Sequence, residues 1–147
     1  YMTGHAFQAL LTDDDVVAVF VNVARHLAPD GRLAFETRNP QARAWESWTP
    51  HKTRSVVETS RHGRIEQCFE AVAENDTGVV AIAQHDRYLD KGIHHVGRSR
   101  IRFINQERVA ALLARAGLAP QAWYGGWDRS GFSPAAREII VVAQRAS

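Results

Sequence analysis

The segment spanning residues 12–37 constrains the fold of this chain more than any other. Thr12 is followed by three aspartates, and Thr12 and Asp15 have the spacing of a capping box, which predicts the start of a helix. The apolar residues that then recur at helical spacing are Val16, Val19, Phe20, Val23 and Leu27. A Pro29-Asp30-Gly31 turn ends this pattern, and residues 32–37 predict a short strand. A helix that leads through a tight turn into a strand is typical of a parallel α/β fold.

The middle of the chain predicts an antiparallel sheet. Its four stretches with strand character are residues 53–60, 64–73, 79–89 and 94–103. They are separated by His62-Gly63, by Asn75-Asp76-Thr77-Gly78 and by Asp90-Lys91-Gly92, residue types that favour tight turns. Consecutive strands joined by short turns form a meander. We therefore expect residues 53–103 to be an antiparallel β insertion within a single domain that covers residues 1–147.

The remaining elements flank this meander. Residues 41–48 predict a short helix that carries Trp45 and Trp48. After the meander, Asn105 is the expected cap of a second helix that ends at Gly117. Two further strands are predicted at residues 122–124 and 138–144, and the second is an apolar run typical of a strand buried on both faces.

Composition and charge exclude several classes of protein. The formal net charge is only +2, so we expect no nucleic-acid partner. No apolar run is long enough to cross a bilayer, so we expect no membrane partner. Cys68 is alone and no internal disulfide can form, which favours a cytoplasmic location. His94 and His95 are neighbours in a predicted strand and point to opposite faces, so we expect no metal site there.

Four motifs of the chain are shared with one known family. They are Gly-His-Ala-Phe-Gln at residues 4–8, Pro-Asp-Gly-Arg-Leu at 29–33, Tyr-Gly-Gly-Trp-Asp at 124–128 and Glu-Ile-Ile-Val-Val-Ala at 138–143. With them the chain resembles the second half of the class I S-adenosylmethionine-dependent methyltransferases. The fold class that this resemblance implies is α/β, a Rossmann-like methyltransferase carboxyl half with an antiparallel β meander insertion.

The resemblance also assigns each strand a place in a seven-stranded sheet. Residues 1–3 become the end of strand four, and residues 32–37 become strand five. Residues 123–124 and 138–144 become strands six and seven, a closing antiparallel hairpin. The β meander is then an insertion after strand five, where such enzymes often carry a cover that faces the substrate.

The activity implied is methyl transfer from S-adenosyl-L-methionine to a small-molecule methyl acceptor. The family binds this cofactor with a glycine-rich turn after its first strand and an acidic residue at the end of its second, and neither feature occurs in these residues. We therefore expect the chain to be a piece of a longer protein. The alternative from a different class is a stand-alone, non-catalytic α+β module that binds a ligand or forms dimers through the meander.

The candidate site residues lie beyond the carboxyl ends of the strands, where open α/β sheets bind ligands. The resemblance places the cofactor near Thr3, Gly4, His5 and Phe7. His5 is also the candidate general base, because an imidazole titrates near neutral pH. The candidate substrate contacts are Glu36, Arg38, Trp45 and Trp127. The simpler interpretations remain open: His5 as a loop residue, Glu36 and Arg38 as a surface ion pair, and the tryptophans as core residues.

The first strand of this chain also predicts how copies of it interact. Without strands one to three, the strand at residues 1–3 has an open edge, and open edges pair with other chains. We expect either a homodimer through this exposed sheet edge or detachment of residues 1–7 from the sheet.

Overall fold

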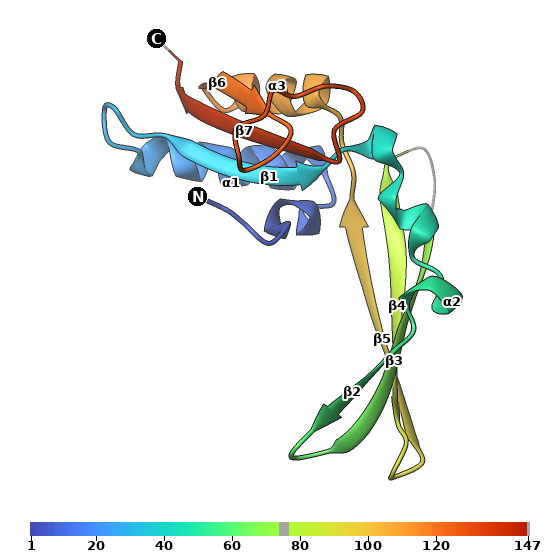
Figure 1. Ribbon diagram of the computed structural model, residues 1–147. Helices are drawn as coiled ribbons and strands as arrows, with labels where there is room; N and C mark the ends of the chain where they lie inside the picture. The colour runs from blue at the N-terminus through green and yellow to red at the C-terminus, as the bar shows by residue number, and fades with distance from the viewer. Residues whose placement is uncertain (74–76, 147) are drawn as a thin grey trace. The chain divides into compact units, whose positions relative to one another are not determined.

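The computed structural model describes residues 1–73 and 77–146 of the chain, which fold as two compact units (Figure 1). The first unit contains Tyr1–Arg43 and Arg102–Ser147, and the second contains Ala44–Ile101. The second unit begins before the predicted insertion at residues 53–103, because the short helical turns ahead of its first strand belong to it. In the predicted turn at residues 75–78, Asn75 and Asp76 lie outside the described residues, and Gly78 has a φ of 79°.

The sheet of the first unit has the strand order β1-β7-β6 (Figure 1). β1 (Leu33–Arg38) pairs antiparallel with β7 (Glu138–Arg145), which pairs antiparallel with β6 (Leu118–Tyr124). On the other side of β1, Met2 forms an isolated parallel bridge with Phe35. This is the arrangement that the resemblance implies, with strand four parallel to strand five and strand seven inserted antiparallel beside it.

Both long helices of the first unit begin at the predicted caps. In α1 (Asp13–His26) the Thr12 hydroxyl accepts from the Asp15 backbone and the Asp15 carboxylate accepts from the Thr12 backbone, which confirms the capping box. In α3 (Gln106–Arg115) the side chain of Asn105 accepts from the backbone of Arg108. The two helices pack on the same face of the sheet and share one core. Its fully buried members include Val16, Phe20, Phe35, Val109, Leu112, Leu113 and Val141.

The first residues of the chain are attached to this core. The backbone N–H of Met2 donates to the carbonyl of Ala34 at 2.9 Å. Phe7 is only 2% exposed, and its ring lies 4.6 Å from that of Phe35 between centroids. The predicted detachment of residues 1–7 is therefore wrong. The bridge at Met2 and the burial of Phe7 together hold this segment on the sheet. The predicted homodimer remains a prediction.

The second unit is the expected meander. Its sheet has the order β2-β3-β4-β5, built from β2 (Ser55–Thr59), β3 (Gly63–Ala73), β4 (Val79–Tyr88) and β5 (Ile93–Arg102). The predicted helix at residues 41–48 is wrong. Two 3₁₀ turns, η2 (Pro40–Ala42) and η3 (Ala44–Ser47), stand there instead, because Arg43 between them has a φ of 45°. The short α2 (Pro50–Thr53) follows.

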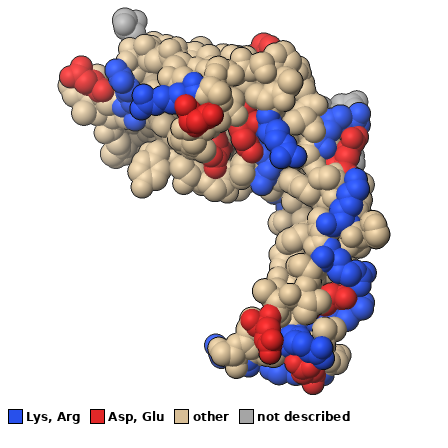
Figure 2. Space-filling view, in the orientation of Figure 1, with Lys and Arg blue, Asp and Glu red and all other residues tan. Residues whose placement is uncertain are grey.

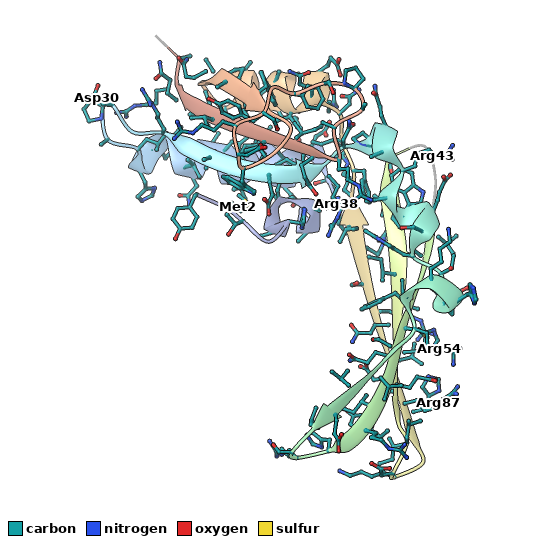
Figure 3. All side chains as sticks on the ribbon, viewed as in Figure 1. Met2, Asp30, Arg38, Arg43, Arg54 and Arg87 are labelled. Atoms are coloured by element: carbon teal, nitrogen blue, oxygen red, sulfur yellow. The ribbon has the colours of Figure 1, made fainter. Side chains whose placement is uncertain are left out.

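The two faces of the meander carry different side chains. On one face Glu66 pairs with Arg54 at 2.9 Å and with Arg87 at 3.4 Å, and Figure 3 labels both arginines. Acidic and basic side chains are interspersed over the visible surface of this unit (Figure 2). His94 contacts His85, whereas the ring of His95 packs against Tyr88, so the two histidines lie on opposite faces as predicted.

No helix within residues 1–73 and 77–146 is long and apolar enough to span a membrane.

Candidate functional site

The candidate site lies at the carboxyl end of β1, on the sheet face opposite the helices. Residues alternate in direction along a strand, so Glu36 and Arg38 share this face while Phe35 and Thr37 point to the helical side. The loop that precedes η1 (Ala6–Ala9) and the loop at residues 125–131 both reach this strand end. The structure thus brings together segments that are about 30 to 130 residues apart in the sequence.

The loop before η1 holds His5 in an unusual backbone conformation. Gly4 and His5 have φ values of 68° and 58°, both in the left-handed region. Glycine adopts this region freely, but a residue with a Cβ does so at a cost of about 1 kcal/mol or more, and such residues cluster at functional sites. The backbone N–H of His5 donates to Glu36 Oε1 at 3.1 Å, which compensates for part of this strain.

Glu36 is the acceptor that joins the two loops to the strand. Its other oxygen, Oε2, accepts a hydrogen bond from the indole N–H of Trp127. Burial opposes ionisation of this carboxyl group, which is only 7% exposed, but the hydrogen bonds from Trp127 and from the backbone of His5 and Gly4 lower its pKa below the ordinary value of 4.5. Glu36 is therefore a carboxylate at neutral pH, with both oxygens bonded to the loops.

The imidazole of His5 faces a second carboxylate. His5 Nε2 lies 3.1 Å from Oε2 and 3.2 Å from Oε1 of Glu138, the first residue of β7. About a quarter of each side chain is exposed, 26% for His5 and 28% for Glu138. Sequence reasoning missed Glu138, because it opens an apolar strand and only the register Arg38↔Glu138 reveals that it lies beside the end of β1.

Arg38 is fixed by buried groups on the same face. Its Nη1 donates to Oε1 of Gln8 at 2.7 Å, and Gln8 in turn donates through Nε2 to the carbonyl of Arg102 at 3.2 Å. Gln8 is completely buried. Burial lowers the pKa of Arg38, and the charges of Glu138 and Glu36 act against that shift. Figure 3 shows Arg38 at the end of β1.

Of the other predicted site residues, some lie beside His5 and Glu36 and others lie elsewhere in the structure. Thr3 and Gly4 lie in the loop before η1, beside His5. Phe7 packs in the core, where it anchors this loop, and Trp127 is 54% exposed above Glu36. Trp45 lies in η3, in the second compact unit. The contacts of these residues with cofactor or substrate stay predictions.

A cavity of about 480 Å³ lies at the same edge of the sheet, near the amino end of α3. Its walls combine the carboxamides of Asn39, Gln41, Asn105 and Gln106 with the rings of Trp123 and Phe132. Asn39 is fixed there by hydrogen bonds from its Nδ2 to the carbonyls of Pro134 and Ala136. Glu107 is the single charged residue in the wall of the cavity. Within the described residues, no group of three or more His, Cys, Asp or Glu side chains is arranged to hold a metal ion.

Comparisons with known proteins agree with this architecture at the level of the fold. No protein-family model matches the chain, and no curated protein sequence matches it. Among solved structures, it resembles the CcbJ methyltransferase from Streptomyces caelestis, with a TM-score of 0.75 and 14% identity over 99% of this chain and 55% of that one. An S-adenosylmethionine-dependent methyltransferase from Clostridium acetobutylicum gives a TM-score of 0.71 and 12% identity over 99% and 56% of the two chains.

A third similar structure carries the cofactor. CalS10, described as an amino pentose methyltransferase from Micromonospora echinaspora with SAM bound, gives a TM-score of 0.67 and 18% identity over 98% of this chain and 57% of that one. The chain therefore has the fold of the class I S-adenosylmethionine-dependent methyltransferases. It spans about half the length of the solved structures that it matches.

Proposed function

We propose that this chain forms the acceptor-binding part of an enzyme that transfers a methyl group from S-adenosylmethionine to a small molecule. The observation that carries the proposal is the convergence of the His5 loop and the Trp127 loop on Glu36. They meet at the carboxyl end of β1, and an open α/β sheet binds its ligands at the carboxyl ends of its strands. The likeness of the whole chain to methyltransferase structures supports the same proposal.

The charges of the described site suit this cofactor. Glu36 and Glu138 are acidic, Arg38 is the one arginine bonded into the network described above, and the carboxylates complement a sulfonium cation. Thr3, Gly4 and His5 are the residues we propose to lie against the cofactor, with Gly4 leaving room for close approach of the backbone, while Phe7 anchors their loop in the core. When bound, S-adenosylmethionine supplies an activated methyl group.

The chain's own residues then position the acceptor and remove its proton. The transfer is an in-line displacement, so alignment of the acceptor supplies much of the catalysis. Trp127 offers an exposed ring against which an acceptor can pack, and Glu36 and Arg38 offer a carboxylate and a guanidinium for its polar groups. His5 takes the proton that the acceptor must lose before its lone pair can form the new bond to carbon.

We further propose that the acceptor atom is an amine nitrogen. An ammonium group is attracted by the carboxylates of Glu36 and Glu138, which both bond to His5, before it loses its proton. CalS10, which the chain resembles in fold, is described as an amino pentose methyltransferase, so its substrate carries an amine, and this supports the choice.

The test is methyl transfer by the full-length protein encoded by the gene that contains these residues. Labelled S-adenosylmethionine is offered with a panel of amines, amino sugars included, and the label in each product is counted. We expect transfer to at least one amine, and a loss on the order of 10²-fold in kcat for His5→Ala. His26→Ala is the matched control, because His26 is exposed and bonds to Asn22 of its own helix. Equal rates for His5→Ala and His26→Ala would refute the role of His5.

A further inference from the structure

We infer that Glu138 positions His5 so that Nδ1, and not Nε2, is the nitrogen that takes the acceptor's proton. This inference rests on the proposed function. It assigns a role to a residue that sequence reasoning did not select, and it identifies the reacting atom of the imidazole.

The assignment follows from the hydrogen-bonding capacity of the two groups. A carboxylate only accepts hydrogen bonds, and both Glu138 oxygens lie within 3.2 Å of His5 Nε2. A neutral imidazole carries one N–H, so the hydrogen of neutral His5 resides on Nε2. Nδ1 then keeps its lone pair and is the only ring atom able to act as a base. A carboxylate that fixes one ring nitrogen in this way sets the tautomer and the orientation of the other.

The backbone and the ring of His5 are held by two different strands. Its backbone N–H is bonded to Glu36 on β1, and its ring is bonded to Glu138 on β7. Glu138 itself is opposite Arg38 in the β1–β7 register, and the two side chains interact electrostatically. The imidazole therefore has little freedom to rotate, while its exposed quarter leaves room for an acceptor.

The proton balance of the step is complete with these groups. The acceptor ammonium first loses one proton to Nδ1, and the imidazolium that forms keeps its Nε2–H against the carboxylate of Glu138. The lone pair left on the nitrogen would then form the bond to the methyl carbon as the sulfur–carbon bond breaks, and the product would leave as a methylated ammonium. Release of that proton to solvent from Nδ1 restores the starting tautomer.

The first test needs no activity and uses ¹⁵N-labelled protein. Long-range ¹H–¹⁵N correlation spectra at a pH of about 8, where an ordinary histidine is neutral, report which ring nitrogen carries hydrogen. We expect the Nε2–H tautomer for His5. His26 is the internal control and should show the opposite tautomer, because its Nδ1 lies 2.8 Å from the carbonyl of Asn22.

Two variants at Glu138 separate the effect of its hydrogen bond to His5 from the effect of its negative charge. Glu138→Gln keeps an oxygen that accepts from Nε2, so we expect the His5 tautomer to persist. Glu138→Ala removes the acceptor, so we expect a mixture of tautomers. An unchanged His5 spectrum in Glu138→Ala, with the fold retained by circular dichroism, would show that Glu138 does not position the ring.

The second test is kinetic and follows the same variants in the full-length protein. We expect kcat to fall at least roughly tenfold in Glu138→Ala and less in Glu138→Gln, with KM within about threefold of wild type in both. Unchanged kcat in Glu138→Ala would overturn the inference. Absence of methyl transfer by the wild type would instead refute the proposed function and the catalytic role of Nδ1, while the spectra separately decide the positioning of the ring.

Discussion

Glu36 shows how one buried carboxylate organises this site. Its two oxygens accept from different loops, the backbone of His5 on one side and the indole of Trp127 on the other. A charged acceptor forms stronger hydrogen bonds than a neutral one, and a buried donor left without an acceptor is destabilising. The same residue that we propose as a substrate contact therefore also holds the loops in place.

Replacement of Glu36 by Gln tests this role. The carboxamide keeps one acceptor but turns an NH₂ group toward the other donor, so we expect Glu36→Gln to destabilise the fold by about 1–3 kcal/mol in urea unfolding. Glu58→Gln, at an exposed position of β2, is the control and should change stability by less than about 0.5 kcal/mol. Equal stability of the two variants would contradict the role of Glu36.

The lowered pKa of Glu36 also predicts how the stability of the fold changes at acid pH. Its folded-state pKa lies below the ordinary value of 4.5, so its ionisation stabilises the folded state above that value, and the contribution is lost as the pH falls through the lowered pKa. Wild type should therefore lose more stability than Glu36→Gln when the pH is lowered from about 5 to about 3. Parallel pH profiles of the free energy of unfolding would contradict this expectation.

Sequence reasoning predicted some residues of the site and missed others. His5, Glu36 and Arg38 were predicted because they lie at the ends of strands at one sheet edge, and Trp127 because its ring can form the wall of an apolar pocket. Glu138 and Gln8 were missed. Glu138 comes into place only through the antiparallel register of β7, and Gln8 is a buried polar residue whose partners, Arg38 and the Arg102 carbonyl, are distant in sequence.

Among the elements, the turn between α1 and β1 depends on a close approach of the backbone. A Cβ on Gly31 would lie 2.8 Å from the nitrogen and 3.0 Å from the oxygen of Ala28, distances too short for ordinary contact. Gly31 also donates to that same carbonyl at 2.9 Å. The tight turn that sets the path of β1 therefore requires glycine.

We expect Gly31→Ala to destabilise the fold by about 1–3 kcal/mol, because backbone atoms of the turn must move. Gly131→Ala, in the same unit, is the matched control, since nothing lies within 4 Å of its added Cβ. The midpoint of urea unfolding should fall for Gly31→Ala and stay near wild type for Gly131→Ala. The opposite order would show that the turn relaxes without cost.

Local signals account for the elements that sequence reasoning predicted well. The cap at Thr12 and the cap at Asn105 each depend on neighbouring residues, and both helices begin there. β6 was predicted too short, because Pro120 is unfavourable in a strand. The structure tolerates Pro120 because β6 is an edge strand and the register shifts between Pro120 and Ala122. This compensation depends on how β6 pairs with β7, so it cannot be recognised from the sequence of β6 alone.

At the scale of the whole molecule, the outer edge of β1 is nearly unpaired in the described residues. Met2 bridges Phe35, and no longer strand lies beyond it in the sheet. An open edge is a template for another chain. We predict that the 147-residue chain self-associates, with a mass in light scattering that rises with protein concentration. A constant monomer mass for the 147-residue chain would contradict the prediction.

We propose that these residues belong to an S-adenosylmethionine-dependent enzyme. Calorimetric titration of S-adenosylhomocysteine, the demethylated product, into the full-length protein tests it most directly. We predict saturable binding at one site per chain, with a Kd between about 1 µM and about 1 mM, in the range common for enzyme substrates. Absence of heat attributable to binding at millimolar ligand, in a folded full-length protein, would contradict the claim.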